Sequence, residues 1–173
     1  MSLTCWMEFD WIILQTAGND VAFRDPVNVD KNLFVNLSSP SSSKYAVVSD
    51  LGSPQDAAQR ILQQYLAEFM STRIGVQREG DIISAEQRTG PDGKLYYDVQ
   101  IRLRSYASRN PLAVTSQERD MGVELEWDRL LIAVLGVANK RLYEMRLQTN
   151  FDVSESELSK LGQTAVSFEC QEV

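Results

Sequence analysis

The chain has 173 residues, 43% hydrophobic and 24% charged, with a formal net charge of −7; these values indicate one globular domain and exclude disordered or collagen-like chains. Because 24 acidic residues outnumber 17 basic ones and the pI is near 4.7, nucleic acids and anionic lipid surfaces are disfavoured as partners. The absence of histidine excludes a Ser-His-Asp or Cys-His catalytic group and any histidine-containing zinc site.

The start of the chain is apolar but has no clear period. We therefore expect an irregular segment over residues 1–17 and a single domain over residues 18–173. The first segment contains Glu8 and Asp10 and no Lys or Arg, unlike a secretory leader or a transit peptide. We expect either a protein that stays where it is made or a chain that begins downstream of a leader. The longest apolar run, residues 130–137, is too short to cross a bilayer.

Two cysteines, Cys5 and Cys170, lie near opposite ends of the chain. If the termini meet, a disulfide between them would close a long loop, worth about 4 kcal/mol or more in the chain-entropy model. Two cysteines define no disulfide framework, so the alternative of two unpaired residues stays open.

Two short strands are expected at the start of the domain. Alternating apolar and polar residues over 21–24 predict the first, which stops before Pro26 because proline cannot continue a central ladder. A similar alternation over residues 33–37 predicts the second. It runs into a polar, flexible connection over residues 38–43.

The clearest helix begins at Pro54. Ser53 is a candidate N-cap, Pro54 suits the first helical position, and Asp56 falls where the acid of a capping box would lie. Apolar residues then recur at spacings of one, three and four up to Met70, opposite a polar face. This pattern predicts an amphipathic helix that lies on a sheet.

Further strands follow this helix. Residues 83–85 lead to a turn at 90–94, which lacks the spacing of a phosphate-binding loop and is interpreted as a hairpin turn. Residues 95–104 alternate strictly, as in an antiparallel strand with one apolar face and one solvated face. Residues 105–126 are predicted to form a long polar connection.

The last part of the chain predicts a buried hairpin and a second helix. Residues 130–137 are apolar on both faces, as in a central strand, and a turn at 139–140 leads to its antiparallel neighbour over 142–147. Ser154 begins a capping box and an amphipathic helix that extends to Phe168. The order strand, strand, helix, four strands, helix predicts an α+β fold with a central antiparallel β-sheet flanked by helices.

A cluster of carboxylates provides one candidate metal site: Glu118, Asp120, Glu124, Glu126 and Asp128. Calcium favours several oxygen ligands on a flexible loop. The cluster lacks the D-x-D-x-D-G-x5-E pattern, which favours the alternative of a solvated acidic rim. Calcium is the one cofactor that the sequence suggests, and its ligands stay unassigned.

Other polar groups have simpler interpretations. Arg102, Arg104 and Arg109 form a small basic island that either docks an acidic partner or, as we favour, is a solvated face. No nucleophile is accompanied by a base and an orienting group. We therefore predict no catalytic or cofactor-binding residues and a protein that is not an enzyme.

Two pairs of large side chains are interpreted as packing residues. Tyr96 and Tyr97 could stack on bases, but their acidic surroundings favour a core position for Tyr97 and a half-exposed position for Tyr96. Met70 and Met145 occupy expected core positions of a helix and a strand. No second soft ligand lies at a matching spacing, so we expect packing rather than metal ligation.

The sequence resembles the PsbP-domain family through motifs that follow one another in the family's order and spacing. They are GNDVAFRDP (18–26) with NLFV (32–35) for the "FxDP … N-x-x-V" opening, DLGSP (50–54) for the "(D/N)LGSPEE" helix start, GKLYY (93–97) for the "DGK-x-YY" hairpin, NKRLY (139–143) for the "NxRLYTL" hairpin, and SF (167–168) for the end of the last helix. Each motif is weak alone, and the resemblance lies in their joint order over residues 18–168.

The resemblance implies a PsbP-like α/β/α domain and an extrinsic protein of the chloroplast thylakoid lumen. Members of this family bind the lumenal face of photosystem II, retain calcium and chloride at the oxygen-evolving complex, or assist photosystem assembly, and they are not established enzymes. The implied role in photosynthesis is docking to lumenal subunits of photosystem II or I, peripheral to the thylakoid membrane and not transmembrane. The alternative is a lumenal calcium or small-ligand carrier that uses residues 118–128.

Two features depart from the photosystem II subunit of the family. The insertion from Ser105 to Trp127 suggests a divergent paralogue, whose role need not include calcium retention, and the absence of histidine removes ligands proposed for manganese or zinc in relatives. The family also has an earlier strand pair and a bipartite transit peptide. We therefore expect a truncated or alternatively started product, with Trp11 matching the family's "P-x-x-W" strand and an exposed sheet edge.

Overall fold

The computed structural model describes residues 2–4, 10–14, 21–38, 45–68, 74–108, 115 and 122–171. Its elements are β1 (Ser2–Thr4), β2 (Ile12–Leu14), β3 (Val21–Arg24), β4 (Asn32–Leu37), the 3-10 helix η1 (Val48–Leu51), α1 (Pro54–Glu68), β5 (Val76–Thr89), β6 (Leu95–Ser108), β7 (Val123–Ala138), β8 (Arg141–Asn150), α3 (Glu155–Val166) and β9 (Glu169–Gln171).

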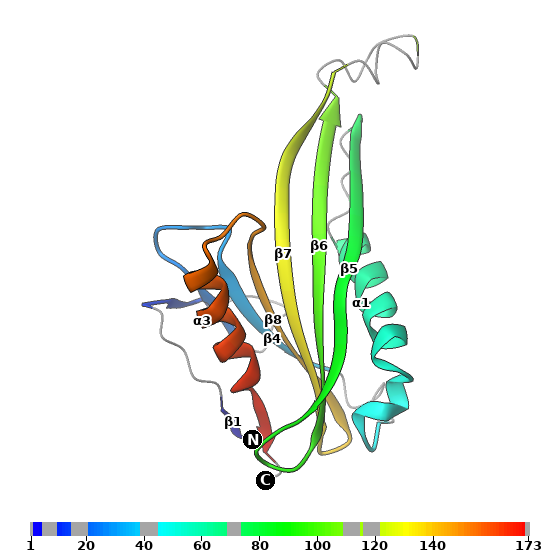
Figure 1. Ribbon diagram of the computed structural model, residues 1–173, viewed down its shortest axis with the longest axis vertical. Helices are drawn as coiled ribbons and strands as arrows, with labels where there is room; N and C mark the ends of the chain where they lie inside the picture. The colour runs from blue at the N-terminus through cyan, green and yellow to red at the C-terminus, as the bar shows by residue number, and fades with distance from the viewer. Residues whose placement is uncertain are drawn as a thin grey trace.

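Seven antiparallel strands in the order β2-β3-β4-β8-β7-β6-β5 form the central sheet (Figure 1). Helix α1 packs on one face, mainly against β5 and β6, and α3 packs on the other face against β7 and β8. A second, two-stranded sheet pairs β1 with β9 and so brings the two ends of the chain together. The predicted α+β fold is confirmed, with helices contributing a minor share of it.

Strand β7 connects the two halves of the core. Its odd-numbered residues from Leu131 to Val137 pack in the cluster under α1, and Leu130, Ile132 and Val134 pack in the cluster under α3. This confirms the predicted central strand that is apolar on both faces. The adjoining turn is also confirmed: Asn139 and Lys140 have φ values of 51° and 58°, as a two-residue turn between twisted strands requires.

Both predicted helix starts are present. The Asp56 amide donates to Ser53 Oγ at 3.2 Å, and the Asp56 carboxylate accepts from the Ser53 amide at 3.0 Å, which completes the capping box of α1. At α3, Ser154 Oγ accepts from the Glu157 amide at 3.3 Å. Met70, the predicted end of the first helix, lies outside the described residues, as do residues 39–44.

The predicted loop over residues 105–126 is wrong at both of its ends. Strand β6 continues to Ser108 and β7 begins at Val123, with Ser105 paired to Trp127 and Tyr106 to Leu125, so that Glu126 is the extra residue of a bulge. This part of the sheet projects beyond α1 (Figure 1). The sequences of its strands lack the one-sided apolar pattern because none of the described helices covers them there, and cross-strand pairing stabilises them.

Two strands occupy part of the N-terminal segment that the sequence predicted to be irregular. Strand β2 pairs with β3, and Trp11, just before β2, packs against the cluster under α3. Each strand is three residues long, which is too short for a detectable period. In the described part of the chain, no helix has the length and apolar character needed to cross a membrane.

Tyr96 was predicted to be half-exposed and is instead fully buried. The sequence pattern placed it on a solvated face, but the end of α3 and strand β9 cover that part of the sheet. The Phe168 ring meets the Tyr96 ring edge-on at 6.5 Å between centroids, and the Cys170 amide donates to Tyr96 Oη at 2.9 Å. The core position predicted for Tyr97 is confirmed, as is that of Met145.

Candidate functional site

The acidic residues predicted as calcium ligands divide between described and undescribed parts of the chain. Glu118 and Asp120 lie outside the described residues. Glu124, Glu126 and Asp128 lie on strand β7 rather than on a loop. Within the described residues, no three Asp, Glu or Cys side chains are grouped closely enough to hold a metal ion.

Arginines and a serine engage two of these carboxylates. The Arg102 guanidinium donates to both oxygens of Asp128, with Nη2 at 2.6 Å from Oδ2 and Nε at 2.9 Å from Oδ1. Glu126 accepts from Ser105 Oγ at 2.9 Å, and Arg78 Nη1 lies 3.6 Å from it. The charges of Glu126 and Asp128 are therefore balanced within the sheet.

The predicted basic island is part of the same pattern of ion pairs. Arg102 stacks on the Phe151 ring with its guanidinium carbon 3.8 Å from the centroid, and Arg104 pairs with Asp81. Arg109 lies outside the described residues. Because both described arginines have carboxylate partners across the strands, the solvated-face interpretation is the one that the geometry favours.

The turn at residues 90–94 is the predicted hairpin turn. The Gly93 amide donates to the Gly90 carbonyl at 3.0 Å, and the Gly90 amide donates to the Lys94 carbonyl at 2.8 Å. Lys94 Nζ donates to the Cys170 carbonyl at 2.8 Å. Cys170 is a buried free thiol whose pKa is raised by burial to about 12. Its suggested partner Cys5 lies outside the described residues.

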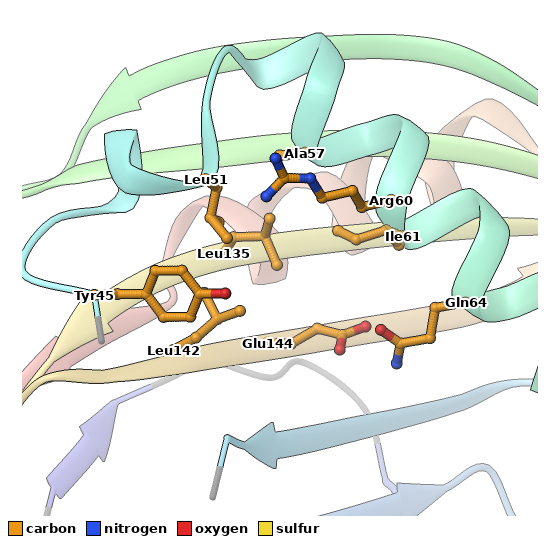
Figure 2. A pocket seen from close by; sticks show the side chains of 9 residues that line it. All are labelled: Tyr45, Leu51, Ala57, Arg60, Ile61, Gln64, Leu135, Leu142 and Glu144. Carbon is orange, nitrogen blue, oxygen red and sulfur yellow. The ribbon is translucent and has the colours of Figure 1, made fainter. Parts of the chain in front are cut away.

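A cleft between α1 and strand β8 is the feature that sequence reasoning missed (Figure 2). We call it the α1–β8 cleft. It has a volume of about 200 Å³ and is lined by Tyr45, Leu51, Ala57, Arg60, Ile61, Gln64, Leu135, Leu142 and Glu144. Helix α1 forms one wall, β7 and β8 form the floor, and Tyr45 closes one end. Most of its lining residues are apolar, and its polar groups belong to Arg60, Gln64, Glu144 and the hydroxyl of Tyr45.

Glu144 is the buried charge of this cleft. It is 9% exposed, and the Tyr65 hydroxyl, fully buried under α1, donates to its Oε1 atom. Burial raises the pKa of Glu144, and the hydrogen bond from Tyr65 opposes that shift. Burial also raises the pKa of Tyr65 well above its ordinary value, so Tyr65 stays the proton donor.

A second pair fixes the end of α1 to the sheet next to this cleft. Arg146 Nη1 donates to Glu68 Oε2 at 2.6 Å, and its guanidinium carbon lies 4.7 Å from the centroid of the Tyr65 ring and 5.3 Å from that of Phe34. Gln64 Nε2 donates to the other oxygen of Glu68 at 2.9 Å. These contacts hold the helix wall of the cleft in place.

The sequence contained a partial indication of this arrangement. Glu144 and Arg146 alternate with apolar residues in the predicted strand 142–147, a pattern that normally marks a solvated face. The sequence could not show that α1 lies over this face of β8. Tyr65 is one of the apolar residues predicted along the first helix, and nothing in the sequence indicated what its hydroxyl group would contact.

A second cleft of about 310 Å³ lies between the segment before η1 and the hairpin turn, lined by Ala46, Val47, Val48, Gly93, Lys94, Leu95 and Val137. Its one ionisable side chain, Lys94, is engaged with the Cys170 carbonyl. Neither of these two clefts brings a nucleophile next to a base and an orienting group.

Comparisons with known proteins agree on one family. The PsbP family model matches residues 5–170. The "PsbP domain-containing protein 1, chloroplastic" of Arabidopsis thaliana is 49% identical over 164 residues, covering 95% of this chain and 56% of that protein. CyanoP of Synechocystis sp. is 33% identical over 86 residues, covering 50% of this chain and 42% of that protein. The chain thus spans about half the length of these curated relatives.

A solved structure supports the fold. The solution structure of cyanobacterial PsbP (CyanoP) from Synechocystis sp. PCC 6803 superposes with a TM-score of 0.63 and 23% identity, covering 98% of this chain and 93% of that one. At this level of identity the similarity concerns the arrangement of strands and helices and not the function.

Proposed function

Because the chain belongs to the PsbP family, we propose that it is a non-catalytic extrinsic protein of the chloroplast thylakoid lumen that docks on photosystem II or takes part in photosystem assembly. The observation that carries this proposal is the family match over residues 5–170, together with 49% identity to a chloroplast relative. The compartment and the photosystem partner come from the resemblance to the family and are part of the proposal.

The projecting end of the sheet supports a docking role. We call it the arm and define it as residues 76–79, 104–108 and 123–128. It combines ion pairs with exposed apolar side chains: Leu125 is 52% exposed and Val123 is 40% exposed. Apolar anchors among paired charges suit a protein interface, where a few anchors provide affinity and charges guide the approach.

Stacked side chains brace the arm. The Trp127 ring has the guanidinium carbon of Arg78 at 4.8 Å from its centroid and that of Arg129 at 4.4 Å. Such contacts are each worth about 0.5–1 kcal/mol at exposed sites and more when desolvated. They allow a narrow ribbon to present one fixed surface to a larger complex.

Binding to stripped membranes tests the proposal. We expect the protein to bind saturably to thylakoid membranes from which extrinsic proteins have been removed, more weakly at high salt, and to comigrate with a photosystem on a native gel. Leu125→Asp should weaken binding tenfold or more, whereas the matched control Leu158→Asp, at a 39% exposed leucine on α3, should not. Absence of saturable binding would contradict the proposal, and comigration with photosystem I would direct it to that complex.

The carrier alternative has less support from the geometry. Of the five acidic residues suggested as ligands, Glu126 and Asp128 already contact Ser105 and Arg102, and a flexible calcium site needs about six to eight oxygen ligands. Calorimetric titration with calcium tests this alternative directly. Binding at micromolar concentration would favour a carrier over a docking protein.

A further inference from the structure

Among the described residues around the α1–β8 cleft, one carboxylate makes no direct ion pair. Arg146 pairs with Glu68 at 2.6 Å. Arg60 lies one helical turn after Asp56, and its charge helps to lower the pKa of that carboxyl group. The remaining charge is that of Glu144: Arg146 acts on it through space and lowers its pKa, but no described residue forms a direct ion pair with it.

One oxygen of this carboxylate is open to the cleft. The Tyr65 hydroxyl donates to Oε1 of Glu144, and no described residue donates to Oε2. Figure 2 shows the carboxylate turned toward the side chain of Gln64 at one end of the cleft. This oxygen is not among the buried polar atoms that lack a partner, so it is open to solvent, and a cationic donor in the cleft can form a charge-assisted hydrogen bond to it.

The shape of the cleft selects the kind of cation. Most of the wall between Tyr45 and Glu144 is formed by the aliphatic side chains of Leu51, Ile61, Leu135 and Leu142, and α1 adds Ala57 and the exposed Arg60. An aliphatic stem that ends in a cationic head matches such a lining, as lysine and arginine do when they bury their methylene groups. A calcium ion would find one carboxylate and one amide here, far fewer than the oxygen ligands it requires.

We propose that the α1–β8 cleft receives a lysine or arginine side chain of a partner protein, with Glu144 as its charge partner. This inference rests on the proposed docking function and names one anchor of that interface. Binding would convert a carboxylate that is partly desolvated in the free protein into a buried ion pair. Anchors of this kind, enclosed and desolvated, are the contacts that dominate protein interfaces.

A titration of the isolated protein tests the cleft without any photosystem. The probe is N-acetyl-lysine methylamide, followed by the backbone amide NMR signals of Gln64 and Glu144, and the control probe is the same compound acetylated on its side-chain nitrogen. We expect saturable shifts with the charged probe alone. Glu144→Gln should weaken binding tenfold or more, whereas Glu86→Gln, which removes an exposed carboxylate on β5, should leave it unchanged. Equal binding of both probes, or no effect of Glu144→Gln, would overturn the inference.

A steric variant keeps the test valid if Glu144→Gln disturbs folding. Leu142→Phe narrows the cleft without changing any charge and should also weaken binding of the charged probe tenfold or more. Membrane binding then separates this inference from the proposed function. If wild type binds stripped thylakoid membranes and Glu144→Gln binds tenfold more weakly, both stand. If both proteins bind equally, the cleft is not an anchor, and if wild type does not bind, the docking function itself fails.

Discussion

A glycine in the central strand allows a closely packed aromatic ring, and this contact predicts a large effect of one added methyl group. A Cβ atom on Gly136 would lie 2.6 Å from Cε1 of Tyr96 and 3.0 Å from Sγ of Cys170. To reach the 3.4 Å limit of ordinary contacts, the ring carbon would have to withdraw by about 0.8 Å. The ring is held in place because Tyr96 Oη donates to Asp92 Oδ2 at 2.7 Å and accepts from the Cys170 amide at 2.9 Å.

The expected cost of Gly136→Ala follows from these contacts. Overpacking costs about 1–3 kcal/mol, and we place this site at the upper end because the ring cannot rotate away. The reduced entropy of the unfolded chain returns about 0.4–1 kcal/mol. The net loss in free energy of unfolding is therefore about 2 kcal/mol, which corresponds to a fall in Tm of roughly 4–8 °C for a chain of this length.

Gly80→Ala is the matched control. There the added Cβ would lie 2.5 Å from Cδ1 of Leu62 and 2.6 Å from Cδ2 of Leu103, which are the ends of flexible side chains. These methyl groups can move by rotation about their side-chain bonds, so we expect a loss of no more than about 1 kcal/mol.

Calorimetry or urea unfolding of both variants provides the measurement. Replacing the ring by Tyr96→Leu should reduce the cost of Gly136→Ala to below about 1 kcal/mol, because the two sites are in direct contact. If Gly136→Ala melts like the wild type, or if Gly80→Ala is the more destabilised variant, the steric reasoning is refuted.

Three further outcomes follow from buried polar groups. Burial raises the pKa of Glu144 in the folded protein above its ordinary value of 4.5. The stability that the protonated carboxyl group contributes is therefore complete below pH 4.5 and is lost as the pH rises through the pKa of the folded state. In urea unfolding, Glu144→Gln should become more stable relative to wild type over this pH range. Tyr65→Phe removes the donor to that carboxylate and should lower the free energy of unfolding by about 1–3 kcal/mol, measured in the same assay. In a Cys5→Ser background, Cys170 is buried with a pKa of about 12 and should react with a thiol reagent only after denaturation, as followed by absorbance.

Local structure could be predicted from the sequence wherever it depends on interactions between residues that are close together in the chain. The capping box of Ser53 and Asp56, the turn at 139–140 and the alternation of residues 95–104 each depend on residues a few positions apart. Their geometry is set by backbone dihedral angles and by the side-chain period, and both are visible in a short window.

The arm was missed because its strands are not stabilised by a one-sided apolar face. Ser105 pairs with Trp127 in the ladder, and Asp128 is held by Arg102 from the neighbouring strand. These partners are more than twenty residues apart in the sequence, so their complementarity has no local pattern. A polar stretch without a one-sided apolar period was therefore interpreted as a connection.

The sequence by itself determined the order of the main elements, the apolar faces of the principal strands and the resemblance to a family, because these depend on local spacing. Tertiary structure alone decided which polar residues would be buried. Tyr96 became buried when α3 and β9 covered its face, and Glu144 became a buried charge when α1 was placed over β8. A side chain's solvation depends on what covers it, and segments distant in the chain provide that cover.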